Sequence, residues 1–202
     1  MAIRNVVFDY GQVMIHFDPA YMAARVTSVP EDIQLLAEVV FDRLYWDRLD
    51  SGAISDEEVL AACRQRLPQR LWRTAEELYG TWFYHTPPVA GMRELVAHLR
   101  KRYGVGVYLL SNIPPHFARQ RETIPVLGEF DGCVLSGELG IIKPDRAIFA
   151  HLCTTYGLVP EETVFIDDSP RNVAGAEAYG IQGYRFDGDA ERLKRYLEDI
   201  LG

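Results

Sequence analysis

The sequence of 202 residues predicts an α/β fold with a doubly wound parallel sheet. Short apolar runs rich in β-branched residues alternate with segments of helical periodicity, and this alternation favours parallel strands joined by helices. Three of the apolar runs end in polar residues of the kinds used in catalysis. Since open parallel sheets bind ligands beyond the carboxyl ends of their strands, we expect the functional site there.

The first predicted strand, residues 3–8, is apolar on both faces, as the centre of a parallel sheet requires. Further strands are expected at 105–110, 132–135, 163–166 and 184–186.

Helices are expected between these strands. Residues 92–99 place apolar side chains at i, i+3, i+4 and i+7, and residues 193–201 form a similar stripe. Residues 173–179 predict a short helix that Gly180 is well placed to end.

One segment breaks the alternation. From about residue 19 to about residue 85 the sequence is helical and rich in aromatic residues, and Ser55 is placed to cap a helix with an acidic first turn. The sequence therefore predicts an α/β core formed by residues 1–18 and 87–202. A small all-helical unit of residues 19–86 is expected as an insertion after the first strand.

The composition limits the classes of partner. A formal net charge of −8 argues against nucleic acid or an anionic membrane, which need basic surfaces, but permits a small anionic substrate. The three scattered cysteines favour a reducing compartment. We find neither a signal-peptide pattern nor an apolar stretch of membrane-spanning length. We expect a cytoplasmic protein, present as a monomer or a homodimer.

The polar residues at the strand ends form a set in the order Asp9, Ser111, Asn112, Lys143, Asp167 and Asp168. Each one alone commonly serves a cap, a turn or a solvated surface. Together they offer carboxylates for a divalent cation, a hydroxyl and an amide for phosphate oxygens, and a positive charge. Adjacent carboxylates also repel each other unless a cation lies between them.

At these positions the chain resembles the haloacid dehalogenase superfamily. FDYG at 8–11, LLSN at 109–112, KP at 143–144 and FIDDS at 165–169 are similar to its four motifs, in order. The resemblance spans nearly the whole chain and implies a Rossmann-like core with a C1-type cap. GAISDEEV and DDSPRNVAGAEAYGI are similar to the bacterial branch that contains α-D-glucose-1-phosphate phosphatases. The resemblance implies a Mg²⁺-dependent phosphatase for a small phosphorylated metabolite, with a sugar phosphate preferred.

The resemblance also implies a nucleophile and a metal site. Asp9 would attack phosphorus and form an aspartyl phosphate, which divides hydrolysis into two steps. Mg²⁺ would bind the Asp9 carboxylate and the backbone carbonyl of Gly11. In the fourth motif, Asp168 is expected as the direct ligand, with Asp167 in support or linked through water.

Three further residues would bind the transferring phosphoryl group. The resemblance implies that Ser111 and Asn112 hold its oxygens and that Lys143 neutralises charge on the phosphate and the nucleophile. Positioning and charge stabilisation account for most of phosphoryl-transfer catalysis, so these roles suit the reaction.

Gly11 is a departure from the family pattern. Most phosphatases of the superfamily carry a second aspartate there as the general acid and base, whose help is worth about 10²–10⁴-fold in rate. Neither Gly11 nor the neighbouring Gln12 can transfer a proton. His16 and His116 are the histidines near a motif, although ordinary packing or surface roles are more common for such residues.

The helical insertion is expected to select the substrate. Aromatic faces suit a sugar ring and an arginine suits an anion. The candidates, most of which we expect in the core of the insertion, are Tyr45, Trp46, Arg48, Trp82, Tyr84 and His85.

Two alternatives remain open on the sequence. A haloacid dehalogenase-type hydrolase of carbon–halogen bonds also attacks through an aspartate, but it needs neither a metal nor the Asp167–Asp168 pair. A non-catalytic or regulatory binding protein is the second alternative, because Gly11 replaces the usual acid and base.

Overall fold

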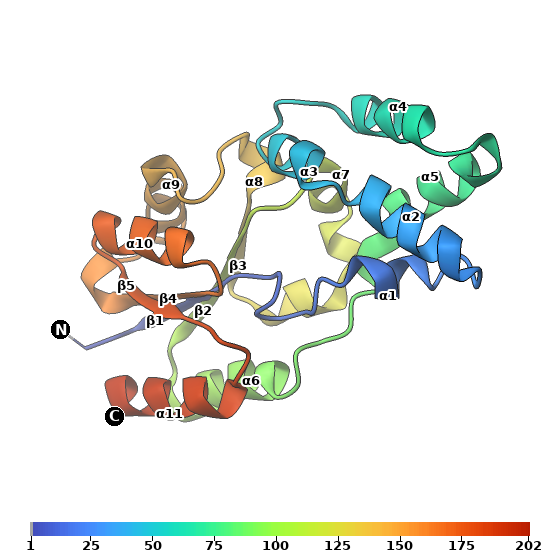
Figure 1. Ribbon diagram of the computed structural model, residues 1–202. Coiled ribbons are helices and arrows are strands. Elements are labelled where there is room, and N and C mark those ends of the chain that lie inside the picture. Colours follow the sequence, from blue (N-terminus) through green and yellow to red (C-terminus); the bar gives the residue numbers. More distant parts are fainter. Residues whose placement is uncertain (1) are drawn as a thin grey trace.

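Five parallel strands form one sheet in the order β3-β2-β1-β4-β5 in the computed structural model, which describes residues 2–202 (Figure 1). The strands are β1 (Asn5–Phe8), β2 (Gly106–Ser111), β3 (Gly132–Leu135), β4 (Thr163–Asp167) and β5 (Gln182–Arg185). The predicted parallel α/β fold is confirmed. The last strand begins two residues before its predicted start, because Gln182 and Gly183 lack the apolar side chains that predict a strand.

Strand β1 lies at the centre and pairs with β2 on one side and β4 on the other, so that Phe8 is level with Leu109 and Ile166. Along the chain, β2 and β3 come first and extend the sheet on one side of β1, and β4 and β5 then extend it on the other side. The strand order therefore reverses beside β1, and the carboxyl ends of β1 and β4 border the crevice in which such sheets bind ligands.

Helices cover both faces of the sheet (Figure 1). Alternate strand residues point to opposite faces, so Val7 packs with α9 and α10, whereas Phe8 belongs to the larger apolar cluster on the face of α6 and α11. The four helices are α6 (Met92–Tyr103), α9 (Arg146–Tyr156), α10 (Pro170–Tyr179) and α11 (Ala190–Leu201).

Helix α9 and the two short helices α7 (Pro115–Ala118) and α8 (Ser136–Leu139) are not among the elements that the sequence pattern predicts. No helix within residues 2–202 is both long enough and apolar enough to span a membrane.

The part of the chain between β1 and α6 is helical, as predicted, and lies beyond one end of the sheet (Figure 1). Its helices are α1 (Pro19–Ala23), α2 (Pro30–Val40), α3 (Arg43–Asp50), α4 (Asp56–Arg66) and α5 (Trp72–Thr81), followed by a 3₁₀ turn at Trp82–Tyr84. The predicted cap is present: the Ser55 hydroxyl accepts from the Glu58 amide, and the Glu58 carboxylate accepts from the Ser55 amide.

The helical insertion packs directly on the α/β core. Leu49, Leu78 and Trp82 of the insertion belong to the same buried apolar cluster as Phe8 of the sheet. This continuous packing holds the insertion over the carboxyl ends of the strands. The division into residues 1–18 with 87–202 and residues 19–86 stays a prediction.

Candidate active site

Three carboxylates meet where β1 and β4 end. Asp9 follows β1, Asp167 is the last residue of β4, and Asp168 comes next in the chain. One carboxylate oxygen from each lies within 4.8 Å of the others. Parallel pairing of β1 with β4 explains this arrangement, because neighbouring parallel strands end at the same edge of a sheet.

Lys143 joins two of these carboxylates from a loop that precedes α9. Its Nζ atom donates hydrogen bonds to Asp9 Oδ1 at 2.6 Å, to Asp167 Oδ2 at 2.7 Å and to the Leu110 carbonyl at 2.9 Å. The lysine is only 3% exposed. The ammonium is therefore fixed at the carboxylates instead of extending into solvent.

Asn112 holds the loop that carries Lys143. Its Oδ1 accepts from the Lys143 backbone amide at 2.7 Å, and its Nδ2 donates to the Lys143 carbonyl at 3.1 Å. The adjacent Ser111 ends β2 and is buried. The structure thus brings Ser111, Asn112 and Lys143 to the same place as the carboxylates, and it gives the Asn112 side chain a positioning contact that the sequence did not indicate.

The buried groups of the site include more carboxylates than positive charges, and burial shifts their pKa values. It raises the pKa of Asp9 to about 7; Lys143 opposes this effect and Asp167 adds to it. Burial alone would lower the pKa of Lys143, but Asp167 and Asp9 raise it above its usual value. The pKa of Asp168 is also raised, first by burial and then by Asp167. One ammonium faces three carboxylates, so a divalent cation fits this oxygen-rich donor set.

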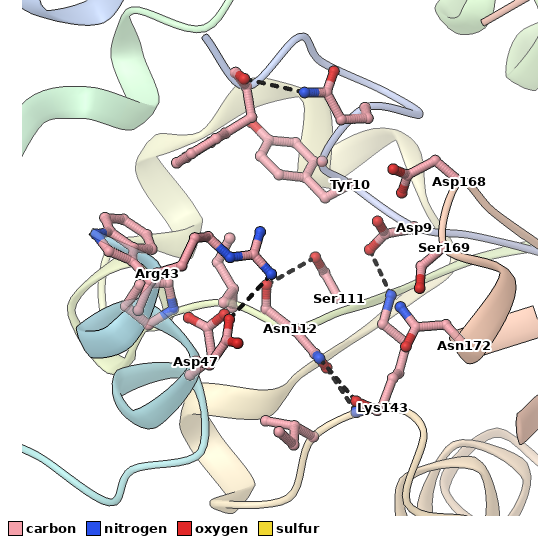
Figure 2. A pocket seen from close by; sticks show the side chains of 18 of the residues that line it. Asp9, Tyr10, Arg43, Asp47, Ser111, Asn112, Lys143, Asp168, Ser169 and Asn172 are labelled. Carbon is pink, nitrogen blue, oxygen red and sulfur yellow. Dashed lines mark hydrogen bonds and ion pairs between the residues drawn. The ribbon is translucent and has the colours of Figure 1, made fainter. Parts of the chain in front are cut away.

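The two adjacent aspartates have different surroundings. Asp167 is fully buried and accepts from Lys143, from the Ser169 amide at 2.8 Å and from Asn172 Nδ2 at 3.1 Å. Asp168 makes none of these contacts and lines the cavity above the strands. Figure 2 shows its carboxylate beside that of Asp9.

A cavity of about 470 Å³ lies over the carboxylates, between the sheet and the helical insertion. Aromatic rings form one wall, where Phe17, Trp46 and Trp82 meet edge to face with centroids 5.3–5.6 Å apart. Polar residues of the core form the floor. The volume and the mixed lining are typical of a site for a small organic molecule.

Helix α3 supplies charged residues to the roof of the cavity. Arg43, Asp47 and Asp50 follow i, i+4, i+7 spacing and share one face of the helix. The guanidinium of Arg43 pairs with Asp47 at 3.2 Å, and Figure 2 shows this pair facing Ser111 and Asn112. The spacing predicts that the three residues share one face of a helix, but it does not show that this face borders a cavity.

Asp50 differs from the other two because its Oδ1 atom is buried and has no hydrogen-bond partner within residues 2–202. Burial raises its pKa to about 8; Asp47 and Asp9 contribute in the same direction, and Arg43 and Lys143 oppose them. The carboxyl group is therefore mostly protonated at neutral pH.

Gly11 lines the cavity without a side chain, and Gln12 follows it with a left-handed φ of 58°. The side-chain Nε2 atom of Gln12 donates to the Phe17 backbone carbonyl at 3.1 Å. A Cβ atom built at position 11 would have no neighbouring atom within 4 Å. The turn after β1 thus has room for an acidic side chain but does not contain one.

The two histidines considered as substitutes lie outside the cavity lining. His116 is buried; its Nε2 accepts from the Trp82 indole at 3.0 Å, and its Nδ1 faces Asp56 at 3.2 Å. Burial lowers its pKa, partly offset by Asp56. His116 therefore joins the insertion to the core.

Of the six candidates in the insertion, the cavity lining includes Trp46 and Trp82. It does not include Tyr45, Arg48, Tyr84 or His85. Tyr84, for example, is half exposed, and its hydroxyl lies 2.6 Å from that of Thr123.

Comparisons with known proteins place this arrangement among hydrolases. The family model described as haloacid dehalogenase-like hydrolase matches residues 3–180. The chain is 28% identical over 207 residues to the D-ribitol-5-phosphate phosphatase of Bacteroides thetaiotaomicron, with 94% of each chain covered. It is 28% identical over 184 residues to a sesquiterpene phosphatase of Aspergillus oryzae, with 89% of this chain and 88% of that protein covered.

A solved structure of a haloacid dehalogenase family enzyme from Bacteroides thetaiotaomicron, described as a magnesium complex, has a similar fold. The TM-score is 0.70 and the identity 26%, and the match covers 96% of this chain and 100% of that one.

Proposed function

The chain belongs to the haloacid dehalogenase-like hydrolases, and from that premise we propose that it is a Mg²⁺-dependent phosphatase of a small phosphorylated metabolite. The observation that carries the proposal is the meeting of Asp9, Asp167 and Asp168 with the buried ammonium of Lys143 at the floor of the cavity. This set provides a nucleophile, oxygen ligands for a hard cation and a fixed positive charge.

In the proposed reaction, a carboxylate oxygen of Asp9 forms a bond to phosphorus while the bond to the leaving oxygen breaks. The leaving oxygen takes up a proton and departs as the product alcohol, Asp9 carries the phosphoryl group, and the water of the second step replaces that proton. Water then attacks phosphorus, releases inorganic phosphate and restores the Asp9 carboxylate. Lys143 offsets negative charge on Asp9 and on the phosphoryl oxygens in both steps.

For the metal, we assign Asp9, Asp168 and the backbone carbonyl of Gly11 as ligands. Asp167 already accepts hydrogen bonds from Lys143 and Asn172, so it suits a supporting role. Bound Mg²⁺ would neutralise charge on the phosphoryl oxygens.

The phosphoryl oxygens would contact Ser111 and Asn112 beside the nucleophile. The Ser111 hydroxyl is a flexible donor at the end of β2. Asn112 uses one of its two Nδ2 protons for the Lys143 carbonyl, so its second proton is the one assigned to the substrate.

The organic part of the substrate would occupy the space under α3. The aromatic wall suits the carbon face of a sugar or polyol, and Arg43 suits hydroxyl groups or a second anionic group. The relative that acts on D-ribitol 5-phosphate supports a sugar or polyol phosphate. Similarity to the α-D-glucose-1-phosphate phosphatase branch makes that sugar phosphate a specific candidate.

The test is phosphate release by the purified protein from p-nitrophenyl phosphate, with Mg²⁺ and after chelation, with Asp9→Asn as the negative control. A panel should add D-ribitol 5-phosphate, α-D-glucose 1-phosphate, phosphoglycolate and a 2-haloacid. Metal-dependent release of phosphate that requires Asp9 supports the proposal. Metal-independent release of halide would establish a dehalogenase instead. Binding of phosphate without turnover of any compound would indicate a binding protein.

A further inference from the structure

We propose that Asp50, which belongs to the helical insertion, serves as the general acid and base of this site in place of the side chain that Gly11 lacks. The inference rests on the phosphatase function proposed above and adds a catalytic residue to it. It also identifies a second task for the insertion, which would deliver a reacting group as well as shape the cavity.

Position is the first support. Asp50 is the last residue of α3 and lines the same cavity as Asp9 and Ser111, from the opposite side. Its Oδ1 atom is buried without a hydrogen-bond partner in the described chain, although buried polar atoms are normally paired. Because a buried charge without a partner is costly, this unpaired oxygen favours a neutral carboxyl group, which carries a proton that it can donate beside the cavity.

Anchoring is the second support, because a general acid must keep a fixed distance from the reacting atoms. The buried Ser136 hydroxyl of the core donates to the Asp50 carbonyl at 2.8 Å and accepts from the Ile113 amide at 2.9 Å. Ile113 directly follows the predicted phosphate-binding pair, Ser111 and Asn112. One serine therefore joins the backbone of Asp50 to the loop that would hold the phosphoryl group.

Close packing around Ser136 reinforces this link. A Cβ atom on Gly137 would come within 2.6–2.7 Å of backbone atoms of Ile113, Pro114 and Pro115, so only glycine permits this approach. The turn after Asp50 also packs on the core: a Cβ atom on Gly52 would lie 3.8 Å from the Cα atom of Gly140. The end of α3 is thus held against the core on two sides.

The protonation state agrees with the role. The charged groups that act on Asp50 are Arg43 and Asp47 on its own helix, Asp9 after β1, and Lys143. Burial is the largest influence, and the pKa of about 8 lets the carboxyl group donate a proton near neutral pH. Asp47 is a poorer candidate, since its side chain is 64% exposed and paired with Arg43.

In the first step, the Asp50 carboxyl group would transfer its proton to the leaving oxygen as the P–O bond breaks and Asp9 bonds to phosphorus. An alcohol departs and Asp50 becomes a carboxylate. In the second step, that carboxylate would take a proton from the water that attacks the phosphorylated Asp9. Inorganic phosphate leaves, and both aspartates return to their starting states.

The experiment compares Asp50→Asn with the unmodified enzyme on two substrates that differ in their need for a proton. One is p-nitrophenyl phosphate, whose phenolate leaves without much help. The other is the best primary alkyl phosphate from the metabolite panel. We expect kcat/KM for the alkyl phosphate to fall by about 10²–10⁴-fold and kcat/KM for the aryl phosphate to change by less than about 5-fold.

Two matched controls accompany this comparison. Glu77→Gln removes an exposed carboxylate from α5 of the same insertion and should change neither substrate. Asp50→Glu keeps the carboxyl group and should recover part of the alkyl phosphatase activity. The unmodified enzyme should also lose kcat/KM for the alkyl phosphate as pH rises through about 8, and Asp50→Asn should lack this pH dependence.

The outcomes separate the two proposals. Equal kcat/KM values for Asp50→Asn and the unmodified enzyme on the alkyl phosphate would overturn the role of Asp50 and leave the phosphatase assignment intact. An equal loss on both substrates would also overturn it, since only a structural effect is independent of the leaving group. Absence of aryl phosphatase activity in the unmodified enzyme would instead overturn the proposed function.

Discussion

The Nζ atom of Lys143 lies 2.6 Å from Oδ1 of Asp9, although 134 positions separate the two residues in the sequence. Both are buried, and the hydrogen bond points the ammonium at the oxygen atoms that would attack phosphorus. A buried carboxylate without a nearby positive charge would be protonated and therefore a weak nucleophile. The proposed nucleophile thus depends on a residue from a distant loop.

Asp9→Asn should reduce phosphate release by more than about 10³-fold, because an amide oxygen is a poor nucleophile. The asparagine has nearly the same shape, so we expect a cooperative thermal transition like that of the unmodified protein. Activity assays and thermal melts measure the two effects separately. Turnover close to that of the unmodified protein would refute the proposed mechanism.

Asp168→Asn should weaken Mg²⁺ binding more than Asp167→Asn does, since Asp168 lines the cavity whereas Asp167 is occupied by Lys143 and Asn172. Asp167→Asn should instead lower the free energy of unfolding by about 1.5–3 kcal/mol, because it weakens the buried hydrogen bonds that Lys143 and Asn172 donate to the charged carboxylate. Calorimetric Mg²⁺ titration and urea denaturation of both variants provide the measurements. The reverse order of metal affinities would show that Asp167 is the direct ligand.

Asp50 should make stability depend on pH. Its pKa is about 8 in the folded protein and near the ordinary 3.8 in the unfolded chain, so between pH 3.8 and about pH 8 the folded state holds a proton that the unfolded state has released. The stability that this proton contributes is fully present below pH 3.8, and it is lost as the pH rises through about 8. Asp50→Asn removes the effect and should raise Tm relative to the unmodified protein more at about pH 8 than at about pH 5. Equal differences in Tm at both pH values would contradict the raised pKa of Asp50.

Gly11→Asp should restore an acid from the turn after β1. The space around position 11 accepts a Cβ atom, and its backbone does not have a left-handed conformation. In the Asp50→Asn background, this substitution should recover at least about 10-fold in kcat/KM for the alkyl phosphate. Gly11→Ala in the same background is the matched control and should recover nothing.

Asp56 should stabilise the contact between the insertion and the core. It accepts from Tyr79 at 2.6 Å, faces His116 at 3.2 Å and pairs with Arg119. Asp56→Ala should lower the free energy of unfolding by about 1–3 kcal/mol, because it leaves buried donors without partners. Urea denaturation is the measurement, and Glu57→Ala, at the exposed neighbouring position, should cost much less.

The sequence predicted the sheet and the floor of the site because both follow from local patterns. Apolar runs mark buried strands, and parallel strands deliver the residues that follow them to one edge. Asp9 and Asp168 could therefore be placed together without a structure. The start of α4 at Ser55 could also be predicted, since a capping box depends on four consecutive residues.

The roof of the site could not be predicted in this way. Asp50 precedes Ser51 and Gly52, which suggest an exposed turn, and its half-buried position arises only when α3 packs on α8. The hydrogen bonds of Ser136 to Asp50 and of Asn112 to Lys143 span 86 and 31 positions, so no local pattern encodes them. Helix α9 was missed although Ile148, Phe149 and Leu152 are buried in it.

The aromatic wall of the cavity allows ligand binding to be followed by tryptophan fluorescence. Trp46 and Trp82 are buried, their ring centroids are 5.3 Å apart, and both line the cavity. Trp72, the third tryptophan, donates to the Leu67 carbonyl at 3.0 Å and is not part of that lining. Indole emission is sensitive to the polarity of its surroundings, so a bound molecule that displaces water from the wall alters the fluorescence of two tryptophans at once. Ligand affinities can therefore be titrated with the Asp9→Asn protein, in the absence of turnover and without an attached dye.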